Sequence, residues 1–342
     1  MARVRLSPTG EEFLVGADED ILTAALRHGV NLQYGCRHGN CSSCKHWLID
    51  GDVDDSATSV YAIPRDERAE GAILLCCTFA KSDLVIEINQ HDGAETLPPM
   101  TPPSRRRATV REQRQRAPDL VELRVELDEP LSFRAGQYAE FSLDTGERRS
   151  YSLVNPPSSG REMTFCIKRV QNGVFSTVLD RIVPGSELQL EAPFGTMFLR
   201  DNGRPVIAAA IGSGIAPILS ILTDAAEHNR DIPIQFYYGA RCASDLVYLD
   251  EIARLSTRLT EFRFIPCLSQ GAADTVPNGR SGRVTRVIAE DIRDASPYDA
   301  YLCGAPEMCD AVGRLLEAKG LPQARIHADK FYPAVESAPV PT

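Results

Sequence analysis

The alternation of apolar and polar residues changes along the chain, and its first region is typical of a small mixed α and β domain. A helix is expected after Asp18, which can cap it, with apolar residues at helical spacing from Ile21 to Leu26. Gly29 ends this helix. The expected strands of the region lie at residues 4–6, 12–15, 46–49 and 84–88.

Two further regions follow, and they differ in the order of their elements. Closely spaced alternating strands at 120–127, 137–143 and 163–170 predict an antiparallel β-barrel. From Pro205 onward, short apolar strands alternate with helical segments, which predicts a doubly wound parallel sheet. Nucleotides bind at the carboxyl ends of strands in such sheets. The expected parallel strands start at residues 206, 234, 262 and 300.

Periodicity is lost between residues 89 and 104, where the segment is polar and contains four prolines. Such a composition predicts an exposed, semi-stiff linker. The expected division of the chain is a first domain at 1–92, a linker at 93–104, a barrel domain at 105–202, and a last domain with a C-terminal tail at 203–342. A chain of 342 residues is long enough for several domains of ordinary size.

The most specific chemical signal is a set of four cysteines, Cys36, Cys41, Cys44 and Cys76. Their C-x4-C-x2-C…C spacing is the plant-type pattern of a [2Fe–2S] cluster. The alternatives are a structural zinc site or unrelated buried thiols. Zinc sites usually combine two C-x2-C or Cys/His pairs, and only one C-x2-C is present in this chain. Cys76 rather than Cys77 is the expected ligand, because the segment resembles the end of plant-type ferredoxin domains, in which the ligand precedes an aspartate by seven residues.

The barrel region contains Arg149-Ser150-Tyr151-Ser152, whose side chains suit a flavin. An arginine can pair with a pyrophosphate, and a tyrosine ring can lie on an isoalloxazine. The serine hydroxyl can reach flavin N5. Downstream, the segment 173–176 follows a strand and opens a helix, which places free amides near a phosphate. These segments match the R-x-Y-S and later motifs of the ferredoxin–NADP reductase superfamily.

The last region contains a glycine loop directly after its first apolar strand, at Gly212, Ser213 and Gly214. Glycines let the backbone approach a dinucleotide, and a helix expected after Pro217 would offer its positive end. NADPH sites need clustered basic residues, whereas the strand ending at Ala240 is followed by a single one, Arg241. NADH is therefore the expected nicotinamide cofactor.

Composition excludes several other classes of function. No apolar run approaches the roughly 20 residues of a membrane span, and the net charge of −10 argues against nucleic-acid binding. The first residues lack the features of a signal peptide, and the cysteines outside the motif are scattered, so a cytoplasmic location is expected. Residues 1–92 carry 15 acidic against 8 basic residues. This excess is either a means of solubility or an acidic docking face for an electron-transfer partner.

Taken together, these motifs resemble the reductase components of bacterial soluble di-iron monooxygenases, in which a β-grasp ferredoxin domain precedes FAD and NAD domains. The resemblance implies that electrons pass from NADH through FAD and the [2Fe–2S] cluster to an oxygenase component, and that the reductase alone is monomeric. Tyr151, Ser152 and Cys303 would take part in the chemistry. The FAD site would comprise Arg149, Tyr151, Ser152, Ile167, Lys168, Gly173, Val174, Phe175 and Ser176. The NADH site would comprise Gly212, Ser213, Gly214, Pro217, Arg241, Cys303 and Gly304, with Phe331 close to the flavin ring.

Two alternatives remain at this stage. A reductase of a Rieske-type dioxygenase can share the same modules in the same order, and only the partner distinguishes it. A non-catalytic electron carrier would keep the cysteines without turnover, although the flavin and nicotinamide motifs argue against it. The substrate of the oxygenase cannot be read from this chain, because that substrate does not touch it.

Overall fold

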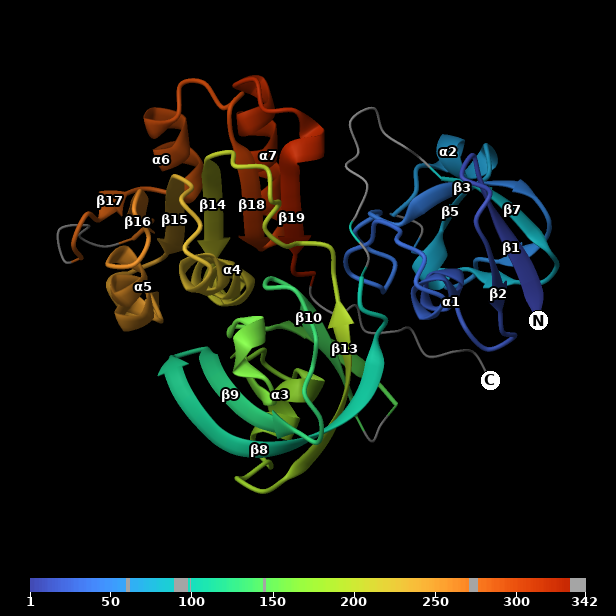
Figure 1. The fold of residues 1–342 in the computed structure, drawn as a ribbon, viewed down its shortest axis with the longest axis horizontal. Helices are drawn as coiled ribbons and strands as arrows, with labels where there is room; N and C mark the ends of the chain where they lie inside the picture. Colours follow the sequence, from blue (N-terminus) through green and yellow to red (C-terminus); the bar gives the residue numbers. More distant parts are fainter. Residues whose placement is uncertain (60–61, 89–97, 99, 144–145, 271–275, 333–342) are drawn as a thin grey trace.

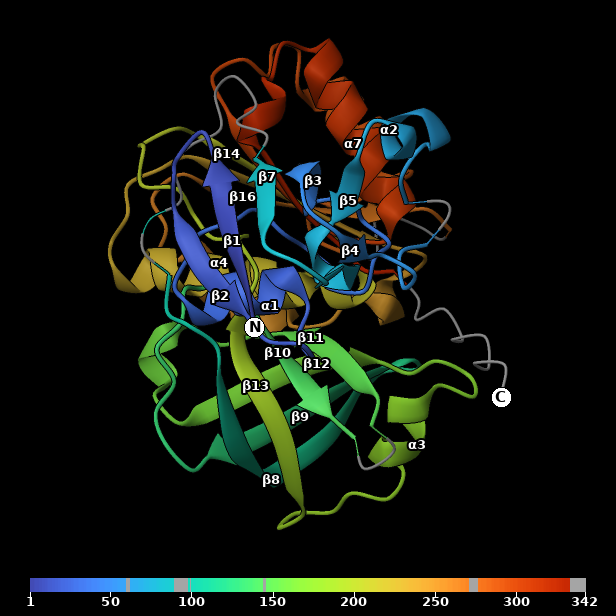
Figure 2. The same ribbon diagram turned by 90° about the vertical axis from the view of Figure 1, so that its right-hand side faces the viewer.

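The computed structural model describes residues 1–59, 62–88, 98, 100–143, 146–270 and 276–332. Three bodies are visible, each with its own sheet (Figure 1). The N-terminal and C-terminal domains lie side by side, and the barrel lies below both of them in Figures 1 and 2. This agrees with the three-part organisation expected from the change in strand and helix patterns.

The N-terminal domain is a mixed five-stranded sheet of order β2-β1-β7-β3-β5. β1 pairs parallel with β7 and antiparallel with β2, and the helix α1 contributes five buried residues to the core. The N-cap of α1 is Asp20 rather than the predicted Asp18, because the Asp20 carboxylate accepts the Thr23 N–H at 2.8 Å. The elements are β1 (Ala2–Ser7), β2 (Glu12–Val15), α1 (Ile21–Arg27), β3 (Lys45–Asp50), β4 (Val53–Asp54), α2 (Arg65–Ala69), β5 (Ala72–Leu74), the 3-10 turn η1 (Leu75–Cys77), β6 (Phe79–Ala80) and β7 (Leu84–Glu87).

The middle domain is a six-stranded antiparallel sheet of order β11-β10-β13-β8-β9-β12. A bridge between Leu153 and Phe165 joins its two ends, as expected for a barrel. Its longest strand, β8, begins at Ser104, one residue inside the predicted linker. The elements are β8 (Ser104–Ala117), β9 (Leu120–Leu127), β10 (Tyr138–Ser142), β11 (Arg148–Ser152), η2 (Pro157–Ser159), β12 (Glu162–Lys168), α3 (Val174–Leu179) and β13 (Glu187–Phe194).

The C-terminal domain is a parallel sheet of order β17-β16-β15-β14-β18-β19. Side chains of α4 and α5 pack on one face and those of α6 and α7 on the other, so the predicted doubly wound sheet is confirmed. The elements are β14 (Val206–Ile211), η3 (Gly212–Gly214), α4 (Ile215–Glu227), β15 (Ile234–Ala240), η4 (Ala243–Asp245), α5 (Leu249–Ser256), β16 (Phe262–Leu268), β17 (Arg280–Ser281), α6 (Val284–Asp291), β18 (Asp299–Gly304), α7 (Pro306–Ala318), η6 (Gln323–Arg325) and β19 (Ile326–Lys330).

Half of the predicted linker, residues 93–97 and 99, lies outside the described residues. Its last part, from Met100 to Pro103, lines a narrow seam between the N-terminal domain and the barrel. Thr101 and Pro102 are exposed, whereas Met100 and Pro103 are half-buried, so this end of the linker is packed rather than free. Among the described helices, none combines the length and the apolar composition needed to cross a bilayer.

Candidate active site

The loop between α1 and β3 carries three of the four predicted cluster ligands. Its backbone turns sharply through left-handed residues at Arg37 (φ 59°), Gly39 (φ 76°) and Ser42 (φ 57°). A Cβ at position 39 would lie 2.8 Å from the Cys77 sulfur, so only glycine fits there. Cys77 is 8% exposed and belongs to the N-terminal core, beneath the loop.

The four predicted ligands form two pairs of thiols. The Cys36 thiol faces that of Cys41, and the Cys44 thiol faces that of Cys76, which η1 presents directly after β5. The Cys76 thiol also lies 3.7 Å from that of Cys77. A [2Fe–2S] cluster takes two thiolates on each iron, so this arrangement fits its donor set. Across the part of the chain that the structure describes, no three His, Cys, Asp or Glu side chains converge as ligands of one metal ion would. A zinc site would need four.

Backbone amides of the loop point at sulfur. The Cys36 N–H donates to Cys41 Sγ at 3.2 Å, and the Asn40 N–H donates to Cys36 Sγ at 3.4 Å. The pKa of the Cys36 thiol is lowered to about 6, chiefly by its hydrogen bond with the Cys41 thiol and then by amides of His38, Asn40 and Cys41, against the effect of burial. The loop therefore favours a thiolate at Cys36, the form that binds metal.

The predicted flavin strand is β11 of the barrel. Its Tyr151 ring lies 4.7 Å from the ring of Phe175, which is 3% exposed and comes from α3. Ser152 is buried. The Arg149 guanidinium is half-exposed and lies 3.7 Å from Glu147, so it remains accessible to a phosphate group. The structure thus brings the R-x-Y-S side chains and Phe175 to one end of the barrel.

The segment that opens α3 lies beside this strand. Gly173 is the N-cap of the helix, and Val174 is its first residue. The Ser176 hydroxyl accepts the Val170 N–H at 2.9 Å, which leaves its own hydrogen available to donate. This short helix start therefore offers a hydroxyl and backbone amides, the donors that a phosphate needs.

The two other predicted FAD contacts lie at the end of β12. The Ile167 side chain is fully buried in the barrel core, so only its main chain can face a cofactor. The Lys168 side chain is 58% exposed and lies 3.9 Å from Asp119. These positions are weaker candidates than those of β11, because one side chain is inaccessible and the other is in solvent.

The glycine loop follows β14 as the 3-10 turn η3. Gly212 adopts a left-handed conformation (φ 55°), and a Cβ there would meet nothing within 4 Å, so the loop is open at this point. Ser213 is half-buried. The helix α4 begins at Ile215, so Pro217 lies inside its first turn. This corrects the prediction that the helix starts after Pro217; proline is tolerated there because first-turn N–H groups have no intrahelical partner.

The end of β18 packs directly against this loop. A Cβ on Gly214 would lie 2.6 Å from the Cys303 carbonyl carbon, so the missing side chain lets the two segments touch. The Cys303 thiol is fully buried, lies 3.5 Å from Met197 Sδ, and has its pKa raised by burial. The Gly304 carbonyl accepts the Phe331 N–H at 2.8 Å. The loop, the thiol and the terminal aromatic residue thus form one packed unit.

Asp329 is a residue that the predicted site did not include. It pairs in register with Cys303 across β18 and β19, and its carboxylate lies beside the Ser152 hydroxyl. Desolvation, followed by the charge of the nearby Cys41, raises the pKa of this half-buried carboxyl to about 7. Its only signal in the sequence is its place two residues before Phe331. Its place near Ser152 of the barrel and Cys41 of the N-terminal domain is decided by the tertiary structure.

The predicted nicotinamide-specificity residue, Arg241, follows β15 and is 67% exposed. Its Nε lies 3.3 Å from the Asp245 carboxylate, which also accepts the Cys242 N–H at 3.4 Å. The arginine therefore has a carboxylate as its neighbour. A carboxylate at this place suits a ribose hydroxyl better than a 2′-phosphate.

The acidic run that contains Asp54 and Asp55 is partly neutralised by basic residues of the first domain. Asp54 lies 3.3 Å from the Lys81 ammonium, and Asp55 forms an ion pair with Arg68. These carboxylates therefore present less free negative charge than the count of acidic residues suggests. The docking-face interpretation of the acidic excess is correspondingly weakened at this position.

Comparison with known domain families divides the chain in the same way as the structure does. A 2Fe-2S iron-sulfur cluster binding domain matches residues 4–81. An oxidoreductase FAD-binding domain matches residues 107–199, and an oxidoreductase NAD-binding domain matches residues 207–314. The predicted cofactors, a [2Fe–2S] cluster, FAD and NADH, are confirmed at this level.

Full-length relatives agree. The chain is 39% identical over 337 residues to the reductase component of propane 2-monooxygenase from Mycolicibacterium goodii, covering 96% of this chain and 97% of that protein. It is 33% identical to the electron transfer component of xylene/toluene monooxygenase from Pseudomonas putida, covering 94% and 91% of the two chains. It is 32% identical to the reductase component of phenol 2-monooxygenase from Pseudomonas sp. strain CF600, covering 98% and 96%.

Solved structures share the whole architecture. An Amycolatopsis cytochrome P450 reductase matches with a TM-score of 0.87 at 29% identity, covering 97% of this chain and 99% of that one. A ferredoxin reductase of carbazole 1,9a-dioxygenase matches with a TM-score of 0.76 at 26% identity, covering 97% and 98%. The fold alone therefore does not select the electron acceptor, whereas the three sequence relatives named above are all reductase or electron transfer components of monooxygenases. The chain belongs to the family of monooxygenase reductase components, and it is an NADH oxidoreductase that passes electrons through FAD and a [2Fe–2S] cluster to an oxygenase component.

Proposed function

We propose that each predicted site residue serves the cofactor for which its motif was identified. Cys36 and Cys41 would hold one iron, and Cys44 and Cys76 the other, because the four thiols already lie in those pairs. The two N–H to sulfur contacts within the loop support thiolate ligands there.

In the barrel, Arg149 would pair with the FAD pyrophosphate, and Tyr151 would lie against the flavin ring. The start of α3, from Gly173 to Ser176, would donate to a phosphate. In the C-terminal domain, the open loop at Gly212 would receive the dinucleotide, and Cys303 would lie beside the nicotinamide. Bound FAD supplies the conversion between the two-electron donor NADH and a one-electron acceptor.

The position of Asp329 is the observation that carries this proposal. Its carboxylate lies beside the predicted flavin-site residue Ser152, its backbone pairs with Cys303, and it lies near the predicted cluster ligand Cys41. The three predicted sites therefore meet around one side chain. With its pKa near 7, Asp329 can hold a proton beside the Ser152 hydroxyl, next to the predicted position of the flavin.

The experiment follows NADH oxidation by rapid mixing in the absence of oxygen, at the flavin and cluster absorption bands. NADH should bleach the flavin first and the cluster second, and adding the oxygenase component should restore both bands. Ser152→Ala and Asp329→Asn should slow the first phase while FAD content is retained. The residue assignment fails if both variants reduce flavin at the unsubstituted rate.

We also infer a preference for NADH over NADPH at Arg241. The carboxylate of Asp245 occupies the neighbourhood in which a 2′-phosphate would need positive charge. Asp245→Ser should therefore raise kcat/KM for NADPH, because it removes repulsion and frees the Arg241 guanidinium. Equal kcat/KM for both nucleotides in the unsubstituted protein would contradict this assignment.

The same proposal includes a monomeric reductase in the cytoplasm, working beside its oxygenase. Ten cysteines are present, and no disulfide is seen among the described residues, which suits a reducing compartment. Size-exclusion chromatography with light scattering would test the monomer. A stable dimer at working concentrations would contradict it.

A further inference from the structure

Arg37 lies in the cysteine loop, between the predicted ligands Cys36 and Cys41, yet its side chain leaves its own domain. The side chain is 6% exposed, and its backbone is left-handed (φ 59°), which is uncommon for a non-glycine residue. A buried guanidinium needs partners that offset its desolvation. Those partners come mainly from the barrel.

Two side chains of the barrel contact the Arg37 guanidinium. Its carbon lies 3.8 Å from the centre of the Phe194 ring, and its Nη1 lies 3.4 Å from a carboxylate oxygen of Glu140. The Glu140 side chain is itself only 10% exposed. Within the N-terminal domain, Arg37 donates to the Thr23 hydroxyl at 3.1 Å. One planar cation thus joins the cysteine loop to β10 and β13.

Hydrogen bonds on both sides of this contact cross the same interface. The Tyr138 hydroxyl donates to the Gly35 carbonyl at 2.8 Å, and the Gly195 N–H donates to the Tyr34 hydroxyl at 2.8 Å. Tyr138 and Phe194 pack as part of the core of the N-terminal domain, although they belong to the barrel. The two domains therefore share a core at this point.

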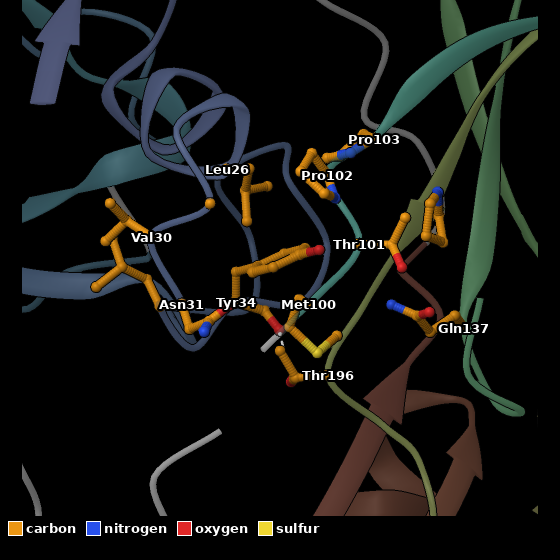
Figure 3. Close-up of a pocket in the computed structure, with 13 residues that line it drawn as sticks. Leu26, Val30, Asn31, Tyr34, Met100, Thr101, Pro102, Pro103, Gln137 and Thr196 are labelled. Carbon is orange, nitrogen blue, oxygen red and sulfur yellow. Dashed lines mark hydrogen bonds between the residues drawn. The ribbon is translucent and has the colours of Figure 1, made fainter. Parts of the chain in front are cut away.

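The linker closes the edge of the interface. Met100, Thr101 and Pro102 lie next to Tyr34, facing Gln137 of the barrel (Figure 3). The free space left there is about 10 Å³, at the lower limit for a single water molecule. A closely packed contact of this kind tolerates little displacement of its side chains.

Glu140 also connects this contact to the predicted flavin strand. It lies opposite Ser150 in the register of β10 and β11, between the positions of Arg149 and Tyr151. We infer that Arg37 is a positioning residue: its buried contact with Glu140 and Phe194 holds the cysteine loop against the flavin barrel, so that flavin-to-cluster electron transfer occurs in one docked geometry. The oxygenase then approaches the exposed side of the loop, at His38 and Ser43. This inference rests on the flavin and cluster sites proposed above.

Glu140→Gln tests the inference without changing the cysteine loop itself. The variant removes the negative partner of a buried cation, so the docked state loses stability relative to an undocked one. Arg148→Gln is the matched control. The Arg148 guanidinium lies 3.1 Å from the same carboxylate, but its side chain is 49% exposed and does not cross the interface. Cluster and flavin content are measured in both variants.

Two readouts are needed, and one of them does not depend on turnover. Flavin-to-cluster transfer after NADH mixing should slow roughly tenfold or more in Glu140→Gln, because the two centres are then no longer held in one docked geometry. Hydrogen exchange at the Gly195 amide should accelerate, since its partner Tyr34 lies across the interface. Arg148→Gln should change neither readout, and Arg37→Gln combined with Glu140→Gln should recover part of the protection at Gly195.

Unchanged transfer and unchanged Gly195 exchange in Glu140→Gln would overturn the inference. So would an equal effect of Arg148→Gln, because the outer pair would then account for it. Absence of flavin reduction by NADH in the unsubstituted protein would instead refute the proposed function. The two failures are therefore distinct.

Discussion

Replacing Gly214 with alanine tests whether the nicotinamide loop and the Cys303 strand end must touch for hydride transfer. The added Cβ would lie 2.6 Å from the Cys303 carbonyl carbon and 2.9 Å from the Gly304 nitrogen, whereas ordinary contacts begin at 3.4 Å. The two segments must therefore separate by nearly 1 Å. Overpacking of this kind costs about 1–3 kcal/mol of folding free energy.

The expected consequences follow from that displacement. A shift of about 1 Å at a reacting centre can lower a rate by about a hundredfold, so NADH-dependent flavin bleaching should slow towards that limit. The melting temperature should fall by roughly 2 to 12 °C, given the cost above and a domain of this size. Stopped-flow absorbance and thermal unfolding measure the two effects.

Gly313→Ala is the matched control for the same substitution. This glycine lies inside α7, and the nearest atom to an added Cβ is Ile326 Cγ2 at 4.0 Å, so no contact is violated. Alanine should stabilise the helix by about 1 kcal/mol and leave flavin reduction unchanged. Unaltered melting and flavin reduction in Gly214→Ala would refute the reasoning, because the contact would then be able to relax without consequence.

Three further predictions concern the cluster, the acid sensitivity and the domain boundary. Cys76→Ser should abolish the visible absorption of the cluster, whereas Cys77→Ser should largely retain it; the reverse result would exchange the ligand assignment. Desolvation lowers the pKa of His327 to about 3 in the folded state, below its unfolded value near 6.5, so its contribution to stability is complete above pH 6.5 and is lost as pH falls towards 3. His327→Asn should therefore lose less free energy of unfolding between pH 7 and pH 5 than the unsubstituted protein does, with a difference of at most about 2 kcal/mol at pH 5. Equal losses in the two proteins, measured by urea unfolding at both pH values, would contradict this. Residues 104–342 expressed alone should bind FAD and reduce ferricyanide with NADH. Their melting temperature should be lower, because Phe194, which is 1% exposed in the full chain, is no longer covered by the N-terminal domain. An insoluble, flavin-free fragment would place the boundary elsewhere.

Much of the individual domains could be predicted from the sequence, because local patterns encode them. The spacing of three of the four cysteines is a covalent property of one loop, and the fold brings Cys76 to that loop. Strand and helix periodicity depends on which face of each element is buried. The change at Pro205, from closely spaced strands to strands that alternate with helices, therefore predicted the parallel sheet. Errors remained at element ends. The capping residue of α1 is Asp20, and α4 begins at Ile215, because several neighbouring residues can satisfy a helix end and only the folded backbone selects one.

The meeting of the three domains was decided by tertiary structure alone. Asp329 is far in the chain from Ser152 and Cys41, and no local spacing links them. Arg37 reads in the sequence as one more basic residue in a polar loop, yet it is nearly fully buried against Glu140, 103 residues away. Contacts of this kind arise where preformed domains pack, and their energy depends on burial and on matching charge across two surfaces. The sequence therefore determined which cofactor chemistry each domain carries, and the packing of the domains determined which side chains connect one centre to the next.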